Sequence, residues 1–181
     1  MQPDLAFSPT RLPYSRAWCI LGACSNAGSL PHVTDTPERE IAPWRRALAY
    51  WCYAWGLSWC AWGIRGANQS FFRAGIRSFD RALRLWPTFT RGYYRRGLIR
   101  GRELNEYAAG IADMGRAIAI DQQWPEPYLQ RGLFERFHGD LHAALADLQQ
   151  YVAISDDPLW RNEAERQIAM IQAEIGGDAA I

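Results

Sequence analysis

The sequence contains no lysine, because all 20 residues counted as lysine or arginine are arginines. Without a lysine there is no P-loop lysine, no Schiff-base lysine for pyridoxal phosphate and no lysine that anchors nucleotide phosphates in a kinase. These mechanisms are excluded. A GC-rich genome is the simplest cause of such a bias. The alternative is selection for the planar, permanently charged guanidinium, which suits carboxylates and phosphates.

Residues that usually mark a catalytic or metal site are also scarce. The four cysteines form neither a CxxC pair nor a dense disulfide framework, so a reducing, cytoplasmic compartment is the simplest expectation. His138 and His142 are four residues apart, but Gly139-Asp140 between them predicts a turn that breaks metal-binding helical spacing. No nucleophile or phosphate motif stands out. We therefore expect a non-catalytic protein without a cofactor or a metal site.

Acidic residues are scarce in the first part of the chain. Up to residue 102 there are 15 arginines against 5 acidic residues, a net +10, whereas from residue 103 onward 5 arginines face 14 acidic residues, a net −9. Between Arg65 and Arg102 ten arginines face only Asp80. A solvated basic face is the plain interpretation, but this density also favours an acidic partner, an anionic lipid surface or nucleic acid.

Strand signals are absent, and most of the chain has helical periodicity. Residues 1–42 contain five prolines and a run of small residues, which predicts an irregular N-terminal arm. From residue 43 onward nearly every segment is compatible with a helix, with breaks at Trp86-Pro87, Trp124-Pro125 and Asp157-Pro158. The regular spacing of these breaks indicates an all-α fold with an internal repeat.

Aligning the chain with itself at a shift of 34 or 35 residues reveals this repeat. Six columns keep their chemical type: Trp59, Tyr94, Tyr128; Ile64, Ile99, Leu133; Phe72, Tyr107, Leu141; Gly75, Gly110, Ala144; Phe79, Met114, Leu148; and Leu85, Ile120, Ile154. Apolar residues three or four apart, with a tiny residue between them, predict pairs of closely packed antiparallel helices. Three stacked pairs can share one core that a single pair cannot form.

These columns resemble the tetratricopeptide repeat family, whose 34-residue unit has a W-x₂-L-G-x₂-Y, A-x₃-F and Pro pattern. The resemblance implies a right-handed α-solenoid of about three helix hairpins, at about 56–90, 91–124 and 125–158, within a repeat region at 43–158. The lysine-and-asparagine clamp that some family members use for C-terminal carboxylates is missing. In residues 159–181, Ala164, Ile168, Ile171 and Ile175 form one apolar stripe, which predicts a C-terminal capping helix followed by a tail.

The resemblance also implies a binding surface, because the first helices of successive hairpins line a concave groove for peptides in this family. Carried over to this chain, the groove residues are Leu57, Ile64, Arg95, Ile99, Arg102, Leu129, Leu133 and Arg136. Helical spacing supports this independently for the second and third units, where apolar and arginine side chains share one stripe. Such a surface suits an extended peptide that bears carboxylates. The alternative is that these are simply exposed residues of a short solenoid.

The segment from residue 44 to 64 is the most unusual part of the sequence, since residues 47–64 carry no charge. Its tryptophans form one helical stripe, consisting of Trp44, Trp51, Trp55, Trp59 and Trp62. A helix that is apolar on all sides must be buried in protein or lipid. Three interpretations stay open: a barely long enough transmembrane helix, a helix that extends the first repeat beneath the N-terminal arm, or an exposed docking surface for a partner, a membrane or a second copy.

The leading functional hypothesis is a non-catalytic adaptor that holds partner proteins through the arginine-lined groove and the aromatic end. The second is an assembly factor or accessory subunit of a membrane complex, with helix 44–64 as its anchor. The third is nucleic-acid binding by the Arg65–Arg102 stretch, in which Phe89, Tyr93 and Tyr94 could stack on bases, although no nucleic-acid module accompanies it. The opposite charges of the two halves also permit head-to-tail self-association.

Overall fold

The structure is a computed structural model that describes residues 41–66 and 68–178, and these residues form helices without any strand. The N-terminal arm predicted at 1–42 lies almost entirely outside the described residues. The helices are α1 (Pro43–Gly66), α2 (Gln69–Leu85), α3 (Thr90–Leu98) with its π-helical continuation η2 (Ile99–Glu103), α4 (Tyr107–Ile120), α5 (Glu126–His138), α6 (Leu141–Ile154) and α7 (Pro158–Asp178).

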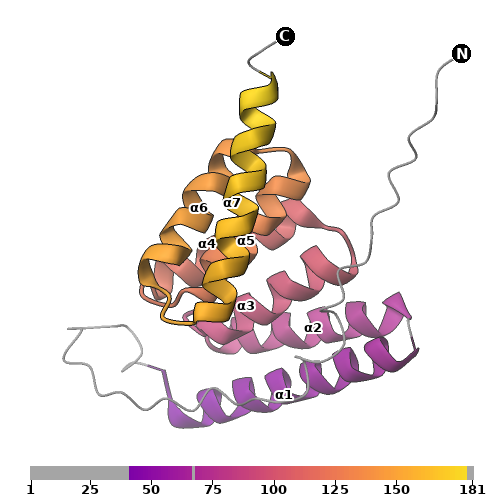
Figure 1. The fold of residues 1–181 in the computed structure, drawn as a ribbon. Coiled ribbons are helices and arrows are strands. Elements are labelled where there is room, and N and C mark those ends of the chain that lie inside the picture. The colour runs from indigo at the N-terminus through magenta and orange to yellow at the C-terminus, as the bar shows by residue number, and fades with distance from the viewer. Residues whose placement is uncertain (1–40, 67, 179–181) are drawn as a thin grey trace, which may run out of the picture. The chain divides into compact units, whose positions relative to one another are not determined.

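The helices pack as successive pairs. Figure 1 shows α1 lying beside α2, and the same pairing joins α3 to α4 and α5 to α6. The pairs then stack in chain order through contacts of α2 with α3 and of α4 with α5, and α7 packs on α6. The described residues therefore form three helix hairpins and a final helix, as the periodicity predicts.

Local sequence signals explain where several helices begin and end. The Asn68 side chain accepts a hydrogen bond from the Ser70 backbone N–H at the start of α2, and Asp140 accepts one from the Ala143 N–H at the start of α6. Gly139 has a φ of 97° and ends α5 in the left-handed conformation that glycine adopts without strain. The predicted turn between His138 and His142 is therefore present.

One glycine in each hairpin brings its two helices into close contact. A Cβ on Gly56 would lie 2.6 Å from Cε1 of Phe79, one on Gly97 would lie 3.0 Å from Cε of Met114, and one on Gly132 would lie 3.0 Å from Cγ of Leu148. The facing side chains are those of the Phe79, Met114, Leu148 column. Each glycine therefore gives up side-chain volume so that the second helix can approach.

These contacts correct the alignment of the first helices. Gly56 and Gly97 are 41 residues apart and Gly97 and Gly132 are 35 apart, whereas the repeat in the second helices is 35 and then 34. The columns that pair Trp59 with Tyr94 and Ile64 with Ile99 are therefore wrong. The first hairpin is longer because α1 continues ten residues past Gly56, while α5 continues only six past Gly132. Similarly, α2 begins six residues before Gly75, while α6 begins three before Ala144.

The π-helix η2 gives the second hairpin its own irregularity. A Cβ on Gly101 would lie 2.3 Å from Cζ of Phe134, so the α5 ring lies directly on the backbone of η2. Phe134 also belongs to a buried cluster with Leu98 and Met114. The glycine in η2 therefore admits the ring that joins the second hairpin to the third.

The last helix covers the C-terminal end of the stack. Ala164 and Ile171 are fully buried in one cluster with Leu148 and Tyr151 of α6, and Ile168 and Ile175 pack against that cluster. Glu165, Arg166 and Gln172 are exposed. The predicted capping helix is confirmed, and burial of its apolar stripe stabilises the end of the third hairpin.

Candidate functional site

A pair of charged residues recurs in the second and third hairpins. In the second, Arg96 Nε donates to Asp113 Oδ2 at 2.9 Å and Arg96 Nη2 to Asp113 Oδ1 at 2.5 Å. In the third, Arg131 Nε donates to Asp147 Oδ2 at 2.5 Å and Arg131 Nη2 to Asp147 Oδ1 at 2.7 Å. Asp113 and Asp147, which stand one repeat apart, therefore each pair with an arginine of the first helix of their own hairpin. These bidentate hydrogen bonds join α3 to α4 and α5 to α6.

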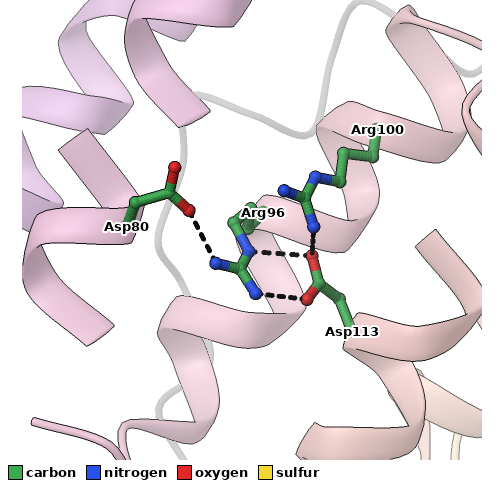
Figure 2. A network of polar contacts seen from close by, with 4 residues as sticks. All are labelled: Asp80, Arg96, Arg100 and Asp113. Carbon is green, nitrogen blue, oxygen red and sulfur yellow. Dashed lines mark hydrogen bonds and ion pairs between the residues drawn. The ribbon is translucent and has the colours of Figure 1, made fainter. Parts of the chain in front are cut away.

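The pair in the second hairpin belongs to a larger network, shown in Figure 2. Arg96 Nη1 also donates to Asp80 Oδ1 of α2 at 2.6 Å, and Arg100 Nη1 donates to Asp113 Oδ2 at 2.9 Å. Burial lowers the pKa of Arg96, but the hydrogen bonds and negative charges of Asp113 and Asp80 outweigh this cost and leave the pKa above its ordinary value. Arg96 and Asp113 are therefore structural residues that are not free to bind a partner.

The third hairpin differs at one position of this network. Glu135 follows Arg131 by four residues, as Arg100 follows Arg96, so a carboxyl group replaces a guanidinium beside the buried aspartate. Burial and then the negative charge of Asp147 raise the pKa of Glu135, the positive charge of Arg131 lowers it by less, and together they bring it to about 7. The Oε2 atom of Glu135 is buried without a hydrogen-bond partner. This carboxyl group therefore takes up a proton near neutral pH.

Two of the arginines predicted to line the groove bind neutral amides. Arg102 of η2 donates from Nε at 3.2 Å and from Nη2 at 2.8 Å to Oε1 of Gln130 in α5, whose side chain is buried. Arg136 of α5 donates from Nη1 to Oε1 of Gln167 in α7. Its Nη2 also lies 3.7 Å from Oε2 of the exposed Glu174. Both guanidinium groups are thus oriented by an uncharged acceptor from the following hairpin or helix, and Arg136 also forms an ion pair with the exposed Glu174.

The apolar residues predicted for the groove fall into two groups. Leu57, Ile64 and Ile99 come together at one cluster between the first and second hairpins, where Ile99 itself is buried. Leu129 and Leu133 join the cluster of the third hairpin, in which Leu129 is buried. Ile99 and Leu129 are therefore core residues, because they show almost no surface to a partner. The partly exposed members are Leu57, Ile64 and Leu133.

The remaining arginine and the rings of the basic stretch are less accessible than the sequence suggests. Arg95 is half-buried and takes part in an interaction within the chain. Phe89 is buried and stacks on Trp86 with ring centroids 4.8 Å apart, while Tyr94 packs on Trp124 at 4.7 Å. The nucleic-acid hypothesis requires free rings that can stack on bases, and these two rings already pack on other aromatic side chains.

Sequence reasoning missed Gln130 and Gln167, which orient Arg102 and Arg136. Their partners lie 28 and 31 residues away along the chain, and neither interval is a spacing within one helix. The exposed ring of Phe137, which stacks on Tyr107 at 5.5 Å, was missed as well. Only its position directly after Arg136 could have drawn attention to it.

The aromatic stripe of α1 lies on the surface. Trp44, Trp51, Trp55 and Trp62 are exposed, and Trp59 is half-buried against Phe71 of α2. The opposite side of α1 is formed by Ala49, Gly56, Cys60 and Gly63, which are buried. In the described part of the chain, no helix combines the length and the apolar composition needed to cross a membrane.

No protein-family model matches this sequence, and neither does any curated protein. Solved structures do match. The first TPR of Spaghetti (RPAP3), bound to the HSP90 peptide SRMEEVD, has a TM-score of 0.62 at 16% identity over 72% of this chain and 95% of that chain. The type III secretion chaperone SycD of Yersinia enterocolitica, in complex with a peptide of the translocator YopD, has a TM-score of 0.60 at 14% identity over 69% and 92%. The N-terminal domain of STI-1 from C. elegans has a TM-score of 0.60 at 14% identity, over 72% of this chain and 99% of that domain.

These identities are low, so the likeness concerns the fold. It agrees with the pairing of the helices into hairpins described above. The described part of this chain has the fold of a tetratricopeptide-repeat domain.

Proposed function

We propose that this protein is a non-catalytic adaptor that holds a partner protein against the first helices of its hairpins. The fold supports the general role, because similar domains were solved with bound peptides of HSP90 and of YopD. The residues proposed to contact the partner are Leu57, Ile64, Arg95, Arg102, Leu133 and Arg136, with Ile99 and Leu129 supporting them from the core.

The observation that carries this proposal is the bonding of Arg102 and Arg136. Arg102 is exposed at the end of the first helix of its hairpin and donates two hydrogen bonds to the amide oxygen of Gln130. A carboxylate accepts stronger hydrogen bonds from guanidinium than an amide does, so an incoming carboxylate can replace the glutamine. Arg96 and Arg131, by contrast, already have buried aspartates as partners.

The expected partner is therefore an extended segment with carboxylate side chains and at least one apolar residue. Its carboxylates would bind the guanidinium groups of Arg102 and Arg136, and its apolar side chain would contact the partly exposed Leu133. The HSP90 peptide in the Spaghetti structure, SRMEEVD, has this composition, with three acidic residues beside apolar ones. The clamp for a terminal carboxylate is missing here, so side-chain carboxylates are the expected ligands.

Native affinity purification with mass spectrometry tests this proposal. The double variant Arg95→Glu/Arg102→Glu should lose the partner that the unaltered chain recovers, because a negative charge then faces the partner's carboxylates. Arg116→Glu is the matched control, because it places the same charge on an exposed position of α4, a second helix. Equal recovery of the partner by the double variant and by the unaltered chain would contradict the proposal.

A further inference from the structure

The exposed side of α1 carries a large aromatic surface, which we call the tryptophan face. It consists of Trp44, Leu48, Trp51, Trp55, Trp59 and Trp62. Trp51 is 68% exposed and Trp44 is 65% exposed, although tryptophan is normally among the more deeply covered residues. An exposed apolar surface of this kind marks an interaction site.

The structure shows why this surface is left without a neighbour. Its position corresponds to that of Arg96 in the second hairpin, since Trp55 precedes the packed Gly56 as Arg96 precedes Gly97. Arg96 faces the preceding hairpin, where it binds Asp80. The tryptophan face is thus the side on which a preceding hairpin would stack, and in the described residues α1 has none.

The indole rings form an array along α1, in which three of the rings contact one another. Trp59 contacts Trp55 and Trp62 edge to face, with ring centroids 6.1 and 5.2 Å apart, and stacks on Phe71 of α2 at 5.8 Å. From Trp44 to Trp62 the array extends about 27 Å along one helix, at about 1.5 Å per residue. Rings that are already ordered lose little conformational freedom on binding.

The hairpin that carries this array is positively charged as a whole. No acidic residue occurs from residue 41 to 79. Four exposed arginines recur along the side of α2 opposite its core: Arg73, Arg77, Arg81 and Arg84. Arg65 is exposed at the end of α1. Among the described residues none of these five has an ion-pair partner within 4.0 Å, and Asp80, the first carboxylate in this region, is bound to Arg96. The occupant must therefore be apolar at its contact surface and negatively charged around it.

These charges argue against a symmetric dimer. Two copies that met through the tryptophan face would bring the arginines of both first hairpins together, with no carboxylate between them. The residue type also suits a bilayer. Indole, with an apolar ring and a polar N–H, is enriched where hydrocarbon meets lipid headgroups.

We propose that the tryptophan face lies on the surface of an anionic lipid bilayer. The indole rings of α1 enter the headgroup region with the helix parallel to the membrane plane, and the positive charge of the first hairpin attracts it to the anionic lipid surface. This contact uses a different face from the one proposed for the partner protein. Either proposal can fail without the other.

Vesicles provide the test, with the full chain and no other protein. The chain should sediment with vesicles of phosphatidylcholine and phosphatidylserine at low salt, and far less with phosphatidylcholine alone or at high salt. Trp51→Ala/Trp55→Ala should reduce the lipid partition coefficient at least tenfold and abolish the blue shift of tryptophan emission on binding. Arg77→Gln/Arg81→Gln should reduce the coefficient about fivefold per arginine and weaken its salt dependence.

Two controls sharpen the test. Phe137→Ala removes an exposed ring from α5, and Arg116→Gln removes an exposed charge from α4, so neither should change the partition coefficient. The altered side chains of all the variants are exposed, and circular dichroism should show unchanged helix content. Failure to bind anionic vesicles at low salt would overturn the proposal. So would equal binding by the tryptophan variant, or lipid-free self-association that this variant abolishes, since a second copy would then be the occupant.

Discussion

In the first hairpin Trp55 and Ser78 occupy the positions that Arg96 and Asp113 hold in the second. The second hairpin is joined by buried ion pairs, whereas the first is joined by phenylalanine rings packed on glycine. Ser78 donates only to the Ala74 carbonyl of its own helix, at 3.1 Å. The same helix pairing is thus maintained by two different kinds of interaction. An ion pair is not required by the fold, and its absence frees one side of α1 for other contacts.

The largest expected effect comes from breaking the ion pairs. Asp113→Ala should lower the free energy of unfolding by about 3 kcal/mol, because it leaves Arg96 and Arg100 without their buried acceptor. Ser78→Ala at the corresponding position of the first hairpin should cost about 0.5 kcal/mol, since it removes one bond within a helix. Urea denaturation monitored by circular dichroism measures both. Similar losses for the two variants would show that the hairpins do not differ as described.

The next effect tests the packing that replaces the ion pairs. Gly56→Ala should lower the free energy of unfolding by about 2 kcal/mol, because the new Cβ would lie 2.6 Å from the fully buried ring of Phe79. Adding Phe79→Leu should recover part of this loss by making room. Gly115→Ala in α4 is the control, since its Cβ meets only Arg131 Nη1 at 3.6 Å and alanine favours the helix. A melting temperature of Gly115→Ala below that of Gly56→Ala would contradict the packing argument.

A smaller effect distinguishes the second hairpin from the third. The folded protein holds a proton on Glu135 up to about pH 7, whereas the unfolded chain releases it near the ordinary pKa of 4.5. The stability that this proton provides is therefore complete below pH 4.5 and is lost as the pH rises toward 7. Glu135→Gln should remove this decline and be more stable than the unaltered chain by about 1 kcal/mol at neutral pH.

Urea titrations at a series of pH values between 4.5 and 7.5 measure this difference. Glu165→Gln on the exposed side of α7 is the control and should keep the slope of the unaltered chain. A Glu135→Gln variant whose stability still falls with rising pH in this range would show that another group is responsible.

The smallest effect concerns the tryptophan face. Trp51→Ala should change the free energy of unfolding by no more than about 0.5 kcal/mol, because its ring contacts mostly solvent. Trp86→Ala should cost about 3 kcal/mol, because Trp86 is only 8% exposed and packs against Phe89. A large loss of stability in Trp51→Ala, measured by thermal melting, would mean that this ring belongs to the core.

The sequence was sufficient to predict the fold class, because periodicity in the second helices survives intact. Phe79, Met114 and Leu148 fill the same position in three hairpins, and Ala164 with Ile171 gave the capping helix. The register of the first helices was not predictable in the same way. The first hairpin is longer at its turn, and a self-comparison at a single shift cannot accommodate a change of length inside one unit.

The candidate site was predicted only in part. Arg102 and Arg136 were found through helical spacing, but their acceptors Gln130 and Gln167 lie in other helices, and contacts between elements are not encoded in local spacing. Ile99 and Leu129 share the stripe of the proposed contact residues and are nevertheless buried. A stripe defines a direction on one helix, whereas burial depends on which neighbour packs there.

The two helices of the first hairpin are longer than those of the third, which indicates how such a chain can change in length. The hairpin has seven more residues between its packed glycine and the facing small residue than the third hairpin has, with about one helical turn added to each arm. Seven residues come close to two full turns, so an insertion of this size rotates the residues beyond it by only about 20°. Around the turn between α1 and α2, seven residues can therefore be inserted or deleted together while the packing of Gly56 on Phe79 is preserved.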